Sequence, residues 1–169
     1  DPHTAKDTAE GLSALGVRAV SISLDIGDIG QIESMVYEAV SKLGSVDILF
    51  NNAGLTRHIS FFDIQEDHWD QINRVNAKGA FFCMQKIGSQ MVKQGTGGRI
   101  INTASIAGKG YRRASNAAYA ASKGGIVQYT KALATAWAKD NIQVNAVLPG
   151  WIDTELTRRA KAEIEGLHE

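Results

Sequence analysis

The chain has 169 residues, 44% of them hydrophobic and 21% charged, and its 18 basic residues balance its 18 acidic ones. This composition predicts one globular core and argues against nucleic-acid binding, which would require an excess of positive charge. No apolar run reaches the ~18 residues of a membrane span, no secretory signal opens the chain, and no Cys/His cluster suggests a metal site. We therefore expect a cytoplasmic protein with no metal and no membrane or nucleic-acid partner.

The first residues predict a helix. Asp1 can cap its N-terminus, Pro2 suits the first helical position, and Gly16 can end it. Apolar and small polar residues then alternate from Arg18 to Leu24, which predicts a strand.

A second helix is expected between Asp28, which forms a capping-box-like start with Gln31, and Gly44 at its C-terminal end. Apolar residues at helical spacing between these ends support the assignment. The short apolar run from Val46 to Phe50 is typical of a buried parallel strand.

A long third helix is expected to start at a cap formed by Asp63 with Glu66 and to end in the glycine-rich stretch that closes at Gly98. Apolar residues at helical spacing define its inner face: Trp69, Ile72, Val75, Gly79, Phe82, Cys83, Ile87 and Met91. Asn76 falls on this face, where a buried amide requires hydrogen-bond partners. We interpret Cys83 as a core residue.

The last elements repeat the alternation. Arg99 to Ala104 predicts a strand, Asn116 to about Lys139 a helix, and Ile142 to Leu148 a final strand. Pro149-Gly150 then breaks the pattern before a helical stretch from about Thr154.

Strands that alternate with helices imply an α/β fold with a parallel sheet covered on both faces. Right-handed crossovers bring the carboxyl ends of such strands to one edge, where ligands bind. Because we find no repeat, linker or low-complexity stretch, we interpret residues 1–169 as one domain or part of one.

Small or polar residues follow each expected strand, and a parallel sheet would bring these segments together. They are Asp25-Ile26, Asn51-Asn52-Ala53-Gly54, Ser105-Ile106-Ala107-Gly108 and Pro149 to Thr154. Gly54 and Gly150 would let a flat cofactor or its phosphates approach the backbone. Taken alone, each segment is equally compatible with an ordinary turn.

Tyr119 and Lys123 are four residues apart, so they lie on one face if this stretch is helical. A fixed ammonium group favours the phenolate and lowers the pKa of the tyrosine, which makes it a better acid or base near neutral pH. The same spacing also occurs on ordinary solvated helix faces.

Together these motifs resemble those of the short-chain dehydrogenase/reductase family, in its single-domain group, over essentially the whole chain. Tyr119 and Lys123 match the family's Tyr-x-x-x-Lys pair. Ser105 matches its catalytic serine and Asn76 its catalytic asparagine. The resemblance implies a doubly wound, Rossmann-like sheet and an oxidoreductase that transfers a hydride between a nicotinamide and a secondary alcohol or ketone.

The resemblance also implies a role for each of these residues. Tyr119 would act as the general acid or base, and Ser105 would hydrogen-bond the substrate oxygen. Lys123 would lower the pKa of Tyr119 and hold the nicotinamide ribose. Asn76 would order water behind Lys123 in a proton relay.

By the same resemblance, NAD or NADP would be held by residues at the strand ends. Asp25 would lie beside the adenine ring. The residues implied in cofactor binding are Asp25, Ile26, Asn52, Ala53, Gly54, Tyr119, Lys123, Pro149, Gly150, Ile152 and Thr154.

The chain also departs from the family pattern. No segment matches the glycine-rich turn and helix that receive the cofactor pyrophosphate. The resemblance thus implies a fold that lacks the first βαβ unit and the last strand, and with them the residue that selects NAD or NADP. The sequence is either part of a longer enzyme or a short, cofactor-deficient scaffold that acts only in assembly.

The substrate class remains open between polyol or sugar oxidation and 3-oxoacyl thioester reduction. The loop from Lys109 to Arg113 would border the substrate and could meet an acidic group. A solvated run of charge is the alternative.

A homo-oligomer, either a dimer or a tetramer, is expected from the resemblance. The helices Ile64 to Met91 and Asn116 to Lys139 would pair with a twofold mate, with Trp137 as an anchor.

Overall fold

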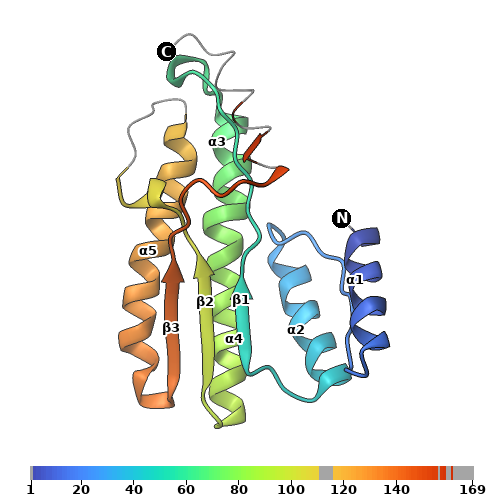
Figure 1. Cartoon of the computed structure of the whole chain (residues 1–169). Helices are drawn as coiled ribbons and strands as arrows, with labels where there is room; N and C mark the ends of the chain where they lie inside the picture. The colour runs from blue at the N-terminus through green and yellow to red at the C-terminus, as the bar shows by residue number, and fades with distance from the viewer. Residues whose placement is uncertain (1, 111–115, 156, 159–160, 162–169) are drawn as a thin grey trace.

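The computed structural model describes residues 2–110, 116–155, 157–158 and 161. Figure 1 shows the arrangement of its elements. Its α-helices are α1 (Pro2–Ala14), α2 (Ile29–Leu43), α3 (Glu66–Asn73), α4 (Ala80–Gln94) and α5 (Ala117–Trp137). Its strands are β1 (Ile48–Asn51), β2 (Gly98–Thr103) and β3 (Ile142–Val147). Short helical turns are η1 (Phe61–Asp63), the π-helical η2 (Arg74–Gly79), η3 (Ile106–Gly108) and η5 (Ala138–Asp140).

The three strands form one parallel sheet in the order β1-β2-β3. In its register Leu49 lies beside Ile100, and Ile100 beside Val144. Three of the four predicted strands are therefore confirmed, each within two residues of the expected ends. The parallel sheet with connecting helices is the predicted α/β, Rossmann-like architecture.

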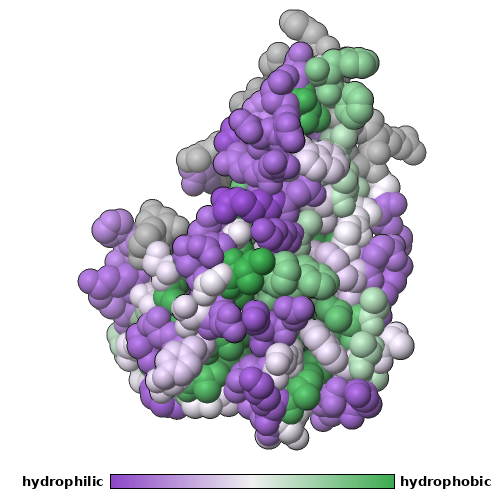
Figure 2. All heavy atoms as spheres, turned by 180° about the vertical axis from the view of Figure 1, so that it is seen from behind, coloured by the Kyte–Doolittle hydropathy of each residue, from purple (hydrophilic) through white to green (hydrophobic). Residues whose placement is uncertain are grey.

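Helices α4 and α5 pack against one face of this sheet, and α2 packs against α4. Figure 1 shows the sheet from its other side, with α4 behind the strands. The core on the helix side is formed by Val36, Met84, Ile87, Met91, Ile100, Ile142 and Val144. Seen from behind, Figure 2 shows hydrophobic residues scattered among hydrophilic ones over these helices.

The opposite face of the sheet differs from the expectation of two covered faces. Ile48 is 65% exposed and Phe50 is 58% exposed, because their side chains alternate away from the helices. Among the described residues no helix covers them. The alternation thus predicts correctly which side chains share a face, but the second face has no cover in this part of the chain.

The strand predicted from Arg18 to Leu24 is wrong, since the structure assigns no strand there. A strand is defined by hydrogen bonds to a neighbour, and β1 pairs only with β2 among the described elements. Local alternation of apolar residues gave the signal, but no described strand is available to pair with this segment.

Two helix starts test the capping predictions. The Asp28 side chain accepts hydrogen bonds from the backbone N–H groups of Gly30 and Gln31, so the cap of α2 is confirmed. The cap predicted at Asp63 is wrong, because Asp63 belongs to η1 and α3 starts after Gln65. The proposed cap at Asp1 lies outside the described residues.

Trp137, the expected anchor of a twofold contact, also packs within its own chain. It is half-buried and packs against the main core, and its indole lies directly over Gly88 of α4. A Cβ added to Gly88 would fall 2.4 Å from the ring atom Cη2. The buried Cys83, by contrast, is the predicted core residue, and burial raises the pKa of its thiol to about 11.

We predict that Gly88→Ala lowers the free energy of unfolding by about 1–3 kcal/mol, because the Trp137 ring must leave its place in the core. The matched control is Gly11→Ala in α1, where an added Cβ meets no atom within 4 Å. That control should raise stability by about 0.5–1 kcal/mol through helix propensity. Urea unfolding of the two variants checks this, and an unaffected Gly88→Ala protein would contradict the packing argument.

Candidate functional site

The carboxyl ends of the strands meet in one crevice, as the parallel sheet predicts. Its lining comes from the segments after β1, β2 and β3 and from the start of α5. The lining residues are Asn52, Ala53, Gly54, Leu55, Thr56, Thr103, Ala104, Ser105, Tyr119, Lys123, Pro149, Gly150, Ile152, Thr154 and Thr157. Three predicted catalytic residues and nine of the eleven predicted cofactor-binding residues therefore lie together.

Ser105 is fixed at the end of β2 by the turn that follows it. Its Oγ accepts a hydrogen bond from the Ala107 backbone N–H at 3.2 Å, which caps η3. Gly108 then packs on the backbone of Lys123, where an added Cβ would lie 2.5 Å from the carbonyl carbon. Only a glycine allows this approach, so Gly108 sets the distance between Ser105 and the helix that carries Lys123.

Tyr119 and Lys123 lie one turn apart on α5, as predicted. The Lys123 Nζ is 5.8 Å from the centroid of the Tyr119 ring and donates a hydrogen bond to the Thr103 carbonyl at 2.7 Å. Lys123 is only 3% exposed, and burial lowers its pKa from 10.5 to about 8. The ammonium is therefore held beside the phenol by a strand-end carbonyl, in an environment that disfavours its charge.

Asn76 lies behind the crevice rather than in its wall. Its side chain is fully buried in η2, and its Oδ1 accepts from the Leu55 N–H at 2.8 Å. Its Nδ2 donates to the Leu55 carbonyl at 2.8 Å and to the Ser122 Oγ at 3.2 Å. The amide thus clamps the loop after β1 to α5, next to Lys123.

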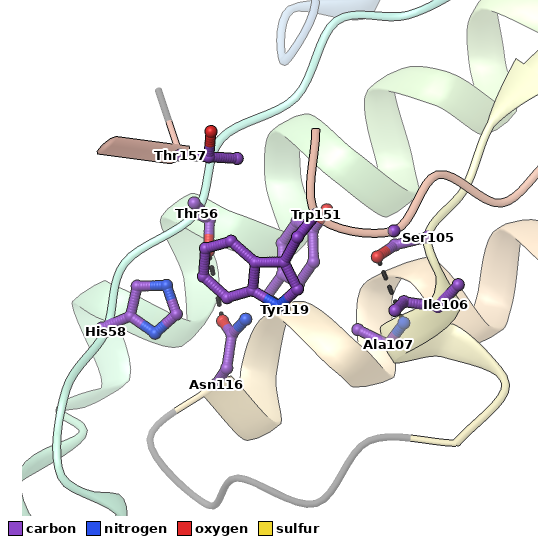
Figure 3. A pocket seen from close by; sticks show the side chains of 10 residues that line it. Thr56, His58, Ser105, Ile106, Ala107, Asn116, Tyr119, Trp151 and Thr157 are labelled. Atoms are coloured by element: carbon purple, nitrogen blue, oxygen red, sulfur yellow. Dashed lines mark hydrogen bonds between the residues drawn. The ribbon is translucent and has the colours of Figure 1, made fainter. Parts of the chain in front are cut away.

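A second hollow adjoins the crevice and shares five lining residues with it: Thr56, Ser105, Tyr119, Gly150 and Thr157. Figure 3 shows the side chains that surround it. The polar residues that line this hollow but not the crevice are His58, Asn116 and Trp151. The Thr56 Oγ1 donates to the Asn116 Oδ1 at 3.2 Å, which joins the loop after β1 to the start of α5.

Asp25 and Ile26 do not line this crevice. They lie in the loop before α2 and pack against η2 instead. The Asp25 carboxylate accepts from Arg74 at 2.6 Å and from the Gly27 backbone N–H at 2.8 Å. Both contacts lower the pKa of Asp25, that with Arg74 the more strongly.

A ladder of buried polar side chains supports the crevice from within. Asn51 at the end of β1 donates to the Ala80 carbonyl at 2.9 Å and to the Asn102 Oδ1 at 3.2 Å. Asn102 of β2 donates in turn to the Thr130 Oγ1 of α5 at 3.0 Å. The sheet, α4 and α5 are therefore joined by hydrogen bonds as well as by apolar packing.

The sequence reasoning missed several residues around the site. Thr56, His58, Asn116 and Thr157 lie in loops or at a helix end and belong to no motif, so only their nearness to the strand ends could have indicated them. Of the basic loop predicted near the substrate, Lys109 is exposed. The remainder of that loop after residue 110 lies outside the described residues.

No group of three or more potential metal-ligating side chains occurs in the described part of the chain. In the same residues, no helix is both long and apolar enough to cross a membrane.

Comparison with known proteins finds a family-model match to short chain dehydrogenases over residues 1–165. The chain is 40% identical to a 2-dehydro-3-deoxy-D-gluconate 5-dehydrogenase from Dickeya dadantii over 94% of its own length and 62% of the relative's. It is 37% identical to a Staphylococcus aureus 3-oxoacyl-[acyl-carrier-protein] reductase, over 95% of the chain and 65% of that protein. The chain thus spans less than two thirds of the length of these relatives.

Solved structures agree with these matches. An NAD+-bound xylitol dehydrogenase superposes with a TM-score of 0.91 at 31% identity, over 98% of this chain and 63% of that one. A gluconate 5-dehydrogenase from Burkholderia cenocepacia, in complex with NADP and tartrate, superposes with a TM-score of 0.87 at 32% identity. The match covers 94% of this chain and 62% of that one.

The lowered pKa of the buried Lys123 predicts how the stability of the protein depends on pH. Because its pKa is about 8 in the folded protein and 10.5 otherwise, the folded state binds fewer protons between these values, and stability rises with pH there. The gain in the free energy of unfolding is fully present above pH 10.5, where it amounts to about 3 kcal/mol. It is lost as pH falls through 8.

Chemical unfolding at several pH values measures this rise in the wild-type protein and in Lys123→Met, which should lack it. Lys131→Met, which removes an exposed lysine from the same helix, is the control and should keep it. Parallel pH profiles for wild type and Lys123→Met would contradict the predicted effect of burial.

Proposed function

Because the chain belongs to the short-chain dehydrogenase/reductase family, we propose that its protein is an NAD(P)-dependent oxidoreductase acting on a secondary alcohol or ketone. The observation that carries the proposal is the convergence of Ser105, Tyr119 and Lys123 in one crevice, with Asn76 clamped behind it. We further propose that these four residues are the catalytic set.

The crevice fits a nicotinamide cofactor. A Cβ added to Gly54 would lie 3.2 Å from the Asn76 Oδ1 and 3.3 Å from the Lys123 Nζ, so a larger residue would crowd the lysine that is expected to hold the ribose. Asn52, Ala53 and Gly54 would hold one side of the cofactor. Pro149, Gly150, Ile152 and Thr154 would hold the nicotinamide end. When bound, the nicotinamide supplies or accepts the hydride.

The residues of this chain would move the proton. Tyr119 gives a proton to the substrate oxygen during reduction or removes it during oxidation. Ser105 donates a hydrogen bond to the same oxygen and stabilises the charge that develops there. Lys123, still protonated for the most part below pH 8, favours the phenolate form of Tyr119.

For the substrate, we propose a small polyhydroxylated compound such as a polyol or sugar acid. The second hollow presents hydroxyl, amide, imidazole and indole groups from Thr56, Asn116, His58 and Trp151, which suit several hydroxyl groups better than an acyl chain. The gluconate dehydrogenases among the relatives support this choice. Reduction of a 3-oxoacyl thioester is the second candidate, supported by the reductases at 37% identity.

We predict that Tyr119→Phe lowers kcat at least a hundredfold while the protein stays folded, because general acid–base catalysis contributes about 10²–10⁴ in rate. The control is Tyr37→Phe, which removes an exposed phenol from α2 and should leave the rate unchanged. The measurement is NAD(P)H absorbance with a panel of polyols, sugar acids and 3-oxoacyl thioesters, using the full-length gene product.

Near-wild-type turnover in Tyr119→Phe would refute the assignment of the acid. Fluorescence titration of the wild-type protein with NADH and NADPH separates an enzyme from a scaffold. Failure to bind either cofactor would favour the scaffold and refute the proposed function.

A further inference from the structure

The π-helical turn η2 contacts both the crevice and the loop before α2. Its residues Arg74 and Gly79 meet the loop at Asp25 to Gly27, while Asn76 from the same turn holds the segment after β1. Six residues thus connect two segments that lie about 30 positions apart in the chain.

On the loop side, the first contact is an ion pair. The Arg74 guanidinium donates to the Asp25 Oδ2 at 2.6 Å, and its atoms also lie over Gly27, where an added Cβ would be 2.3 Å from Nη1. The Asp25 Oδ1 accepts from the Gly27 N–H. Arg74 therefore fixes the orientation of the carboxylate and the fold of its loop at the same time.

The second contact on this side is close packing of backbone against backbone. A Cβ added to Gly79 would lie 2.6 Å from the Ile26 carbonyl oxygen. No side chain fits at that distance, so the glycine lets the loop rest directly on the turn.

The other side of the turn holds the crevice. Asn76 is hydrogen-bonded to the Leu55 backbone and to Ser122, the residue before Lys123. The carbonyl of Ala77 accepts from the Tyr129 hydroxyl at 3.3 Å, and that of Ala80 accepts from Asn51. Any displacement of η2 would therefore reach both the loop and the crevice.

The carboxylate of Asp25 keeps the capacity to bind a ligand. A carboxylate has about four acceptor positions, of which the two bonds to Arg74 and Gly27 occupy one on each oxygen. Its side chain is 45% exposed. A donor such as the exocyclic amine of adenine can therefore reach it from solvent.

We propose that Arg74 is a positioning residue, which seats the Asp25–Gly27 loop on η2 so that the loop receives the adenine end of the cofactor in register with the crevice. This inference rests on the proposed function, because it assumes that an adenine dinucleotide binds here. The other reading is a solvated surface ion pair that stabilises the fold slightly and affects no ligand.

Fragments of the cofactor distinguish the two readings in the full-length protein. Adenosine monophosphate probes the loop side, and nicotinamide mononucleotide probes the crevice side. We expect Arg74→Ala to weaken binding of adenosine monophosphate about two- to fivefold, the range expected for loss of an exposed ion pair. Binding of nicotinamide mononucleotide should not change, and Arg74→Lys should restore much of the loss.

The matched control is Lys42→Ala, which removes an ion pair of similar exposure to Glu38 within α2, remote from the crevice. It should leave the affinity for both fragments unchanged. Calorimetry or ligand-observed NMR provides the dissociation constants, and thermal unfolding shows that all variants are folded.

Unchanged binding of adenosine monophosphate by Arg74→Ala would overturn the inference. So would equal weakening of both fragments, since that would indicate a general loss of structure. A wild-type protein that binds neither NADH nor NADPH would instead refute the proposed function, and the inference with it. If the wild-type protein binds the cofactor and Arg74→Ala binds adenosine monophosphate as tightly as the wild type does, only the inference is refuted.

Discussion

The arrangement of the site depends on one buried amide. Asn76 has no exposed surface, and an amide in that position is tolerated only if its donor and acceptor groups are satisfied inside the protein. It achieves this with the Leu55 backbone in the loop after β1 and with Ser122 of α5. The need to satisfy this single side chain thus fixes the loop after β1 against α5, and with it the surroundings of Lys123.

The same region is held together by further hydrogen bonds at the strand ends. Thr103 accepts from Lys123 through its carbonyl, and its hydroxyl donates to Asn52 at 3.0 Å. Asn51 and Asn102 continue the ladder beneath them. These groups lie in the last residues of β1 and β2 or after them. Their side-chain hydrogen bonds add to those of the backbone where the sheet ends, which explains why the crevice is polar and yet has a defined shape.

The sequence predicted best those features that depend on local chemistry. The cap at Asp28, the i,i+4 pair at Tyr119 and the convergence of the strand-end loops follow from spacing and from the parallel sheet. It failed where a feature depends on a distant partner. Residues 18–24 alternate like a strand but have no described neighbour to pair with. Asp25 was expected to converge with the other strand-end segments, but it does not line the crevice, and Arg74, 49 positions away, holds its carboxylate on η2.

The π-helical turn η2 explains why the buried positions of the predicted third helix differ from those observed. Regular spacing predicted Trp69 on the buried face, but it is 45% exposed, while Ile72, Asn76, Ala80 and Met84 are buried at steps of four residues. Steps of four exceed the 3.6 residues of an α-helical turn, so a regular helix could not keep these positions on one side. The wider turn of η2 absorbs the difference. It brings Asn76 inward without displacing the apolar face of α4. Its Ala77 carbonyl accepts a hydrogen bond from Tyr129, and the Ala80 carbonyl at the start of α4 accepts one from Asn51. π-Helical turns are uncommon and occur frequently at functional sites. Here the turn allows one helical segment to pack in the core and also to support the crevice.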